Sequence, residues 1–409
     1  MQHWTQRLAV AGLISMPSAV VAEEQGTGLM TVASATTLSG YVNTSAHWNP
    51  GTGNGRVPRY FYNTSSKQDG FNLNVVNLAL ERPLDDSMWA AGYKVQMWFG
   101  PDAISYGTTY DASEIDIEAT ALRQAYVTLR QPIGNGITYK VGVFDGLLGY
   151  ESHDAGSNPN YTRAYGLALT PQSHTGVQAS YPVSEHVGLA MAVANTVGPE
   201  IDAKAHAPFE PNAPKAESFK SYSGLLTVTA PESWGFLGGS TLFAGVLNGY
   251  SKNNDWDQTS WYLGFAGDAP VRGVRWGVSY AYLGTTDFNK GDDNYANALA
   301  LYTSFQATER LSLHSRAEYA WSDTKVFGQF AAIDSGNSEI LALTGTVQYD
   351  LWQNVISRLE VRWDHLAGDG QMTRYGGDPA GVGGGSGVPS ANPGSRDHVL
   401  LALNVIYQF

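Results

Sequence analysis

The chain has 409 residues, of which only 15% are charged and 12% are aromatic, and its formal net charge at pH 7 is −13. Soluble domains carry about 25% charged residues, so this surface is poor in ions, and a nucleic-acid partner is excluded because phosphates require a basic face. The absence of cysteine excludes disulfides, thiolate catalysis and cysteine-ligated metals.

The N-terminus has the features of a secretory signal peptide. Arg7 lies in a short polar start, an apolar run follows, and the small residues before Glu23 predict cleavage after Ala22. The run is short for a bilayer-spanning helix, which needs about 20 residues, and no apolar run of about 18 residues follows it. We therefore expect a signal peptide over residues 1–22, a flexible segment over 23–37, one domain over 38–409, and no membrane-spanning helix.

From Leu38 onward, segments of about ten residues alternate between apolar and polar positions, which is typical of strands with two different faces. Near the C-terminus, for example, Leu359 and Val361 share one face, whereas Arg358 and Glu360 share the other. We predict about sixteen strands, an even number as a closed antiparallel barrel requires. They are expected near 38–46, 70–82, 87–99, 121–130, 137–148, 172–181, 185–197, 218–230, 239–250, 258–268, 274–285, 295–307, 311–322, 338–350, 354–366 and 396–409.

One strand contains a slip in this alternation. Phe71 and Leu73 are apolar at odd positions, whereas Leu78 and Leu80 are apolar at even positions. A β-bulge near residue 76 would absorb the extra residue.

The connections between these segments alternate between short and long. Short ones are 83–86, 131–136, 182–184, 269–273, 308–310 and 350–353, and long ones include 47–69, 100–120, 149–171, 198–217, 323–337 and 367–395. Transmembrane barrels have tight periplasmic turns and long outer loops. The pattern predicts an all-β fold, a transmembrane antiparallel up-and-down β-barrel of about sixteen strands.

Aromatic residues on the apolar face are expected to form girdles at the two membrane interfaces rather than sugar-stacking platforms. They are Trp89, Trp261, Trp276, Tyr280, Tyr282, Tyr319, Trp321, Trp363 and Tyr407.

The final strand ends the chain on Phe409, after alternating apolar residues such as Leu403, Val405 and Tyr407. Such an end resembles the signal by which bacterial outer-membrane proteins are recognised for assembly. We therefore expect residence in the bacterial outer membrane, contact with its lipid, and recognition of this strand by the barrel-assembly machinery.

Several stretches carry a resemblance to a known family. They are 67–76 (KQDGFNLNVV), 83–95 (PLDDSMWAAGYKV), 99–103 (FGPDA), 158–166 (NPNYTRAYG), 174–177 (HTGV) and 230–237 (APESWGFL). Together they resemble the outer-membrane β-barrel porins of the OmpL-like type, over roughly residues 38–290 and more loosely the C-terminal strands. The resemblance implies a porin-like barrel and supplies no functional residue.

Charged residues on the inward face are candidates for lining a water-filled lumen. Opposed basic and acidic groups there would tune ion preference, although they could equally pair with their neighbours and brace the wall. The candidates are Lys94, Lys140, Arg316, Glu318, Arg358, Glu360, Arg362 and Asp364.

The loop over residues 149–171 follows the fifth strand and is the candidate constriction loop, although an ordinary surface loop is the alternative. If it folds into the lumen, its polar and aromatic side chains would narrow the pore. They are Glu151, His153, Asp154, Tyr161, Arg163 and Tyr165.

Neither a Gly-x-Ser-x-Gly nor a His-Glu-x-x-His motif occurs, so we expect no catalytic residue, no cofactor and no metal. The leading hypothesis is a porin for passive diffusion of small hydrophilic solutes and ions, with a homotrimer as a weaker expectation. The alternative is a plugged surface or structural barrel whose long outer loops bind a partner or polysaccharide. A soluble secreted β-sandwich is the third hypothesis.

Overall fold

The computed structural model describes residues 36–54, 57–58, 67, 69–106, 108, 119–205, 219–252, 256–287, 292–323, 338–368, 375–376 and 394–409. The expected signal peptide lies outside these residues, as does nearly all of the segment 23–37. None of the helices in the described part of the chain is long and apolar enough to cross a membrane.

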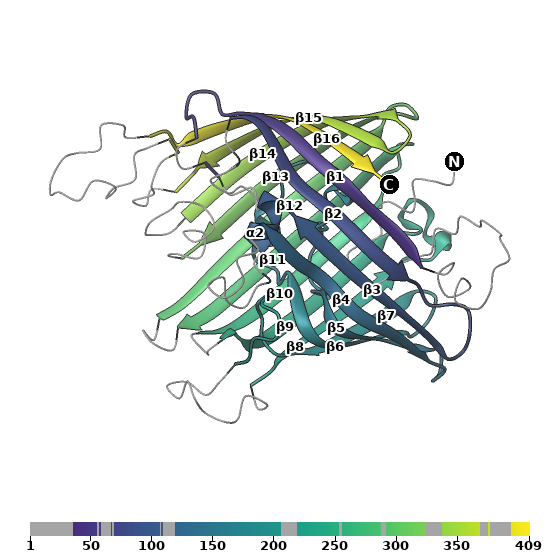
Figure 1. The fold of residues 1–409 in the computed structure, drawn as a ribbon. Coiled ribbons are helices and arrows are strands. Elements are labelled where there is room, and N and C mark those ends of the chain that lie inside the picture. Colours follow the sequence, from purple (N-terminus) through teal and green to yellow (C-terminus); the bar gives the residue numbers. More distant parts are fainter. Residues whose placement is uncertain are drawn as a thin grey trace.

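Sixteen strands in this part of the chain form one closed antiparallel barrel, in which each strand pairs with its sequence neighbours (Figure 1). The first eight are β1 (Thr37–Trp48), β2 (Gly70–Arg82), β3 (Ala90–Phe99), β4 (Thr120–Gln131), β5 (Ile137–Asp145), β6 (Ser173–Pro182), β7 (Val187–Ala194) and β8 (Ser221–Thr229). The others are β9 (Thr241–Tyr250), β10 (Trp256–Asp268), β11 (Val274–Asp287), β12 (Asp292–Gln306), β13 (Leu311–Ser322), β14 (Ser338–Trp352), β15 (Val355–Leu366) and β16 (Asp397–Gln408). The predicted fold class is confirmed.

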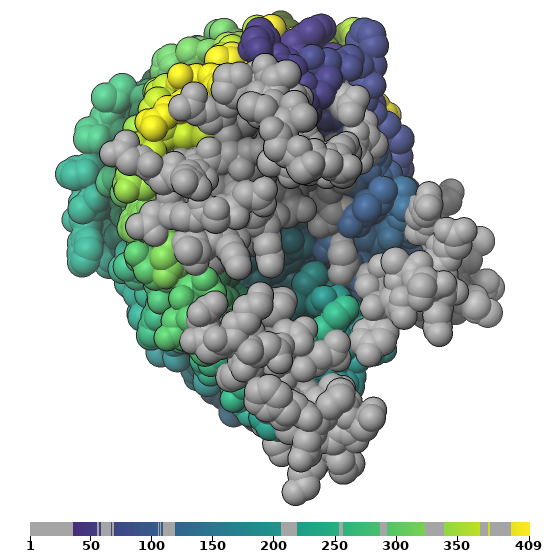
Figure 2. All heavy atoms as spheres, turned by 90° about the vertical axis from the view of Figure 1, so that its left-hand side faces the viewer, coloured from purple at the N-terminus to yellow at the C-terminus, as the bar shows by residue number. Residues whose placement is uncertain are grey.

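The barrel closes where β1 pairs with β16. Gly40 and Phe409 exchange backbone hydrogen bonds of 2.9 and 3.0 Å. A Cβ atom on Gly40 would lie 2.8 Å from the ring of Phe409, so the ring needs a glycine beneath it. Figure 2, which faces the end with the long connections, shows purple β1 close to yellow β16 at the rim.

Three register shifts interrupt the ladder in the described strands, and one of them skips Leu351 near the turn between β14 and β15. The register between β1 and β2 shifts at Asn74, two residues from the predicted position, and the register between β3 and β4 shifts at Arg123, which the alternation did not predict. Both side chains are fully buried on the inside. Each of these two bulges thus adds an inward polar residue and switches the parity of the outward positions that follow it.

The outer face of the barrel is apolar. Leu343, Val361 and Leu403 are 53%, 48% and 46% exposed, although each is an aliphatic side chain. A continuous apolar band of this kind suits contact with lipid. The inner face alternates with it and carries polar residues on β1, β2 and β13–β15.

The connections differ at the two ends of the barrel (Figure 1). At one end they are short: two residues join β14 to β15, and Asn354 there adopts a φ of +68°. The exception at this end is the connection between β8 and β9, which contains the 3₁₀ segment η3 (Glu232–Leu237). At the other end, the connections contain α2 (Pro101–Tyr106), η1 (Ala155–Ser157) and α3 (Tyr165–Ala168).

Candidate functional site: a loop bound inside the barrel

The connection between β5 and β6, residues 146–172, packs against the inner wall of the barrel; we call it the inner loop. Its two ends meet where the Gly146 amide donates to the Gln172 carbonyl at 3.1 Å. Between these ends, it makes hydrogen bonds with inward side chains of β1, β3 and β13–β15. The six constriction-loop candidates all lie in it.

Glu360 on β15 binds the main chain of the inner loop. Its two carboxylate oxygens accept hydrogen bonds from the amides of Tyr161 (2.6 Å) and Thr162 (2.8 Å). The Thr346 hydroxyl on β14 donates to the same carboxylate at 2.7 Å. Glu360 is fully buried, so these charge-assisted bonds replace its lost hydration.

Arg316 on β13 forms the centre of a buried ion network. Its guanidinium lies 2.9 Å from Glu151 of the loop and 2.6 Å from Glu318 on its own strand. It also donates to the Thr162 carbonyl at 2.8 Å. Glu318 in turn accepts from the Tyr165 amide at 2.7 Å. The network therefore joins a carboxylate of the loop, Glu151, to a cation and a carboxylate of the wall, Arg316 and Glu318.

Arg362 and Asp364 on β15 form a second buried pair at 2.9 Å. Arg362 donates to the Arg163 carbonyl at 2.7 Å and lies 5.0 Å from the centre of the Tyr165 ring. The Tyr165 hydroxyl donates to Asp364 at 2.8 Å. This pair therefore fixes the position of α3.

Arg358 on β15 binds a different part of the loop. Its guanidinium donates to the carbonyls of Ala155 and Asn158 and, through Nε, to Gln348 Oε1 on β14. None of the ion pairs found among the described residues includes Arg358.

The loop also reaches β1, β2 and β3, beyond the seam between β16 and β1. The Tyr161 hydroxyl lies 2.7 Å from His47 Nε2 and donates to Asn74, the bulge residue of β2, at 3.1 Å. Asp154 accepts from Gln96 on β3 at 2.9 Å and from the Tyr41 hydroxyl on β1 at 3.4 Å. These contacts extend the attachment of residues 154–161 from β14 and β15 around the wall to β3.

His153 and Arg163 lie within the fold of the loop itself. Arg163 donates to the Tyr161 carbonyl at 2.9 Å, and the His153 ring packs edge-on against Tyr106 of α2, with centroids 5.5 Å apart. Burial, together with the nearby guanidinium groups of Arg123 and Arg163, lowers the pKa of His153 well below its usual value. The ring is therefore neutral at neutral pH.

Small residues make room for the loop on the wall beneath α3. Tyr165 and Leu169 pack in one buried cluster with alanines from β11–β14, namely Ala281, Ala296, Ala298, Ala320 and Ala342. Inward leucine or phenylalanine at these positions would fill the space that α3 occupies. On the far side, Leu147 and Leu148 pack in another cluster that includes Leu225, Phe243 and Leu247.

The remaining two pore-lining candidates lie away from these contacts. Lys94 on β3 pairs with Glu81 on β2 at 3.3 Å, and Lys140 on β5 lies 5.0 Å from the ring centre of Tyr126. The eight candidates thus divide into six that contact the inner loop or each other on β13 and β15, and two on the β3–β5 wall.

Sequence reasoning missed several buried polar groups. Arg123 pairs with Asp145 at 2.9 Å, and Lys67 of the first long connection pairs with Asp102 of α2. A shift of apolar parity between Leu122 and Ala125 signals the bulge at Arg123. We find no local signal for the Lys67–Asp102 pair, because its residues come from different connections. Nowhere in the described part of the chain do three His, Cys, Asp or Glu side chains gather as metal ligands.

The barrel, its unequal connections and the loop bound inside it define a porin-type fold. The sequence matches the family described as "Putative beta-barrel porin-2, OmpL-like" over residues 35–409. The chain belongs to this family, as the resemblance indicated, and it is an outer-membrane porin.

Solved structures agree on the fold. The chain resembles an anion-selective porin from Comamonas acidovorans (11% identity, 91% of this chain and 99% of that chain, TM-score 0.58). It also resembles the outer membrane channel DcaP of Acinetobacter baumannii (15% identity, 91% and 97%, TM-score 0.56). A third is OmpT, an outer membrane protein of Vibrio cholerae, in its trimer form (12% identity, 91% and 99%, TM-score 0.54). No curated protein sequence gives a significant match.

Proposed function

We propose that the barrel passes small hydrophilic solutes and ions by passive diffusion and that the inner loop sets the size limit. The observation that carries the proposal is the attachment of residues 151–165 to inward charges of β13 and β15. A loop fixed by buried, charge-assisted bonds presents a constant cross-section to solutes. Selection then depends on size and charge, without a chemical step.

The inward charges take two roles in this proposal. Arg316, Glu318, Glu360, Arg362 and Asp364 hold the inner loop in place, and all five are buried. Lys94, which pairs with Glu81, and Lys140, which lies over the Tyr126 ring, act on solutes in the remaining lumen from the wall of β3–β5. Their charge acts on ions over the Debye length of about 8 Å at physiological ionic strength.

Planar-bilayer recording tests the channel directly. Purified barrel should give stepwise conductance at neutral pH. Absence of steps from folded, inserted protein would contradict the proposal.

A plugged barrel is the second candidate function. The observation that favours it is that the inner loop contacts strands six positions apart in the sixteen-strand barrel, through Arg316 on β13 and through Gln96 on β3. Liposome swelling distinguishes the two, since entry of small sugars requires an open lumen. Swelling with the wild-type protein would exclude the plug, whereas its absence, together with silent bilayers, would favour a barrel that acts through its outer loops.

We also propose export by the signal peptide over residues 1–22, outer-membrane assembly through the strand that ends at Phe409, and a homotrimer. The trimer form of the similar Vibrio cholerae OmpT supports the last of these. Light scattering of the detergent-solubilised protein should give three chains for each particle. A particle mass of one chain would contradict the trimer.

A further inference from the structure

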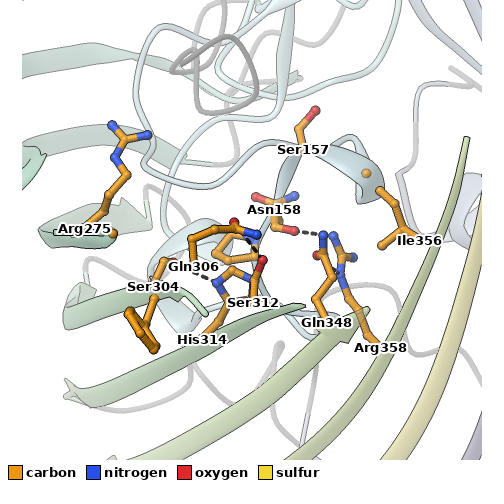
Figure 3. A pocket seen from close by; sticks show the side chains of 14 residues that line it. Ser157, Asn158, Arg275, Ser304, Gln306, Ser312, His314, Gln348, Ile356 and Arg358 are labelled. Carbon is orange, nitrogen blue, oxygen red and sulfur yellow. Dashed lines mark hydrogen bonds between the residues drawn. The ribbon is translucent and has the colours of Figure 1, made fainter. Parts of the chain in front are cut away.

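A pocket lies between the inner loop and the strand ends that adjoin the short turns. It is lined by residues 156–159 of the loop and by polar side chains of β11–β15, among them Arg275, Ser304, Gln306, His314, Gln348 and Arg358 (Figure 3). The pocket has a volume of about 60 Å³ in which a water molecule's centre can move. One water needs about 10–15 Å³ of such space, so the pocket holds several waters or a group of carboxylate size.

The positive charge of Arg358 is not neutralised within this pocket. Its side chain is 3% exposed, and its three hydrogen bonds go to two backbone carbonyls and to Gln348. Arg316 and Arg362 are buried as fully as Arg358, and each pairs with carboxylates. A buried charge without a counter-charge is costly. Since guanidinium has five N–H groups, two remain available for a bound anion.

His314 gives the pocket a second donor. The ring is 6% exposed, and its Nδ1 lies 2.8 Å from the Ser304 hydroxyl. Its Nε2 is buried and has no hydrogen-bond partner. When Ser304 donates to Nδ1, Nε2 carries the ring hydrogen and can donate to a ligand.

Arg275 connects the pocket to solvent. Its side chain is 35% exposed and pairs with Asp268 at 3.0 Å, and it lies on the side of the pocket opposite Arg358 (Figure 3). The pocket therefore has a solvent-accessible cation at one side and a buried cation at the other. Two carboxylates lie on this side, and each is bound elsewhere: Glu360, two residues along β15, accepts from the amides of Tyr161 and Thr162, and Asp350 accepts from Gln348 at 3.1 Å.

We propose that this pocket binds a small carboxylate, which accepts hydrogen bonds from Arg358 and from His314 Nε2 and supplies the missing counter-charge. The site would make small carboxylates a class of solute for the channel, and in this respect it rests on the proposed function. Binding of the carboxylate can still be measured in a barrel that does not conduct. A chain whose net charge is −13 would thus hold an anion at the short-turn mouth of its lumen.

The test uses the full barrel in detergent micelles and ¹³C-acetate as the probe, with binding followed by the NMR line width of acetate. Wild-type protein should bind acetate and should not bind methylammonium, a cation of similar size. Arg358→Gln should weaken acetate binding at least about tenfold, the loss expected for a hydrogen bond to a charged group. His314→Phe keeps an aromatic ring but removes both ring nitrogens, and it should also weaken binding.

Arg310→Gln is the matched control, because Arg310 lies in the exposed turn between β12 and β13 and does not line the pocket. Its affinity for acetate should equal that of the wild type. Equal affinity in wild type and His314→Phe, or no acetate binding by folded wild type, would overturn the site. Planar-bilayer conductance, measured beside acetate binding, separates the two proposals. Binding without conductance contradicts the channel alone, and conductance without binding contradicts the pocket alone.

Discussion

At the residue scale, the wall holds the inner loop mainly through the loop's main chain. Glu360 accepts from two amides, while Arg358 and Arg362 donate to carbonyls. Each such bond has one charged partner, and hydrogen bonds to charged groups contribute about 1.5–3 kcal/mol each. A single neutral substitution on β15 should therefore loosen a whole segment of the loop.

Glu360→Gln should weaken the attachment of the loop by about 3 kcal/mol. An amide NH₂ group, which cannot accept a hydrogen bond, would replace one of the two oxygens that accept from the amides of Tyr161 and Thr162. We expect faster protease cleavage within residues 152–164 and noisier single-channel current. Glu339→Gln is the control, since Glu339 lies on the neighbouring strand and accepts from Tyr319 on the outer side of the barrel. Identical cleavage rates for the two variants would refute a clamping role for Glu360.

The burial of His153 leads us to expect that acid loosens the inner loop. Its pKa is lowered by burial and by Arg123 and Arg163, so the unfolded or released loop binds the proton more tightly. The resulting stabilisation is complete above the ordinary pKa of histidine, about 6.5, and is lost as the pH falls below it. Open-channel noise should rise between pH 7 and pH 4 in the wild type. The rise should be smaller in His153→Gln, and an unchanged pH profile would count against this role.

At the scale of elements, α3 depends on the alanines of the strands beneath it. Cβ atoms of Ala281 and Ala298 lie 3.7 Å from where a Cβ on Gly166 would be, so the helix already touches the wall. Bulky inward residues are common elsewhere in the barrel, as Phe243 and Tyr262 show. The alanines therefore mark the area where the loop docks.

Ala298→Leu should displace α3, because overpacking a filled site costs about 1–3 kcal/mol. We expect a changed single-channel conductance with an intact barrel by circular dichroism. Leu299→Ala, on the outer face of the same strand, is the control and should leave conductance unchanged. An Ala298→Leu channel that conducts like the wild type would show that α3 does not shape the pore.

At the scale of the whole molecule, strand periodicity was sufficient to predict the barrel. All sixteen strands were placed, with ends within three residues; the third, expected at 87–99, spans Ala90–Phe99. Period-two alternation is imposed by lipid on one face and polar groups on the other, so a single sequence shows it. The bulge at Asn74 was detectable for the same reason.

The contacts within the lumen could not be predicted in this way. Alternation assigns Arg316 and Glu360 to the inner face but does not tell whether water or a loop meets them. Their partners are about 150 to 200 residues away, as in the bond from the Tyr161 amide to Glu360. The pocket beside Arg358 also depends on the carboxylates around it being bound to other groups, as Glu360 is to the loop amides, and this becomes visible only in three dimensions.

Closure of the barrel gives a prediction at this scale. Phe409 pairs with Gly40, and its ring lies over that glycine. Phe409→Ala should lower the fraction of heat-modifiable, folded barrel in the outer membrane. Tyr407→Ala, which removes an exposed ring on the same strand, is the control. Equal folded fractions for the two variants would exclude a special role for the terminal residue.

The wall binds main-chain amides and carbonyls of the inner loop at residues 155, 158, 162 and 163. These hydrogen bonds do not depend on which side chain stands at each position. Mutations at more exposed loop positions between these anchors, such as Ser157, can change the size and charge of the opening while the loop keeps its place. Natural variation could thus alter which solutes pass without a compensating change in the strands, and an engineer could use the same positions to tune the opening.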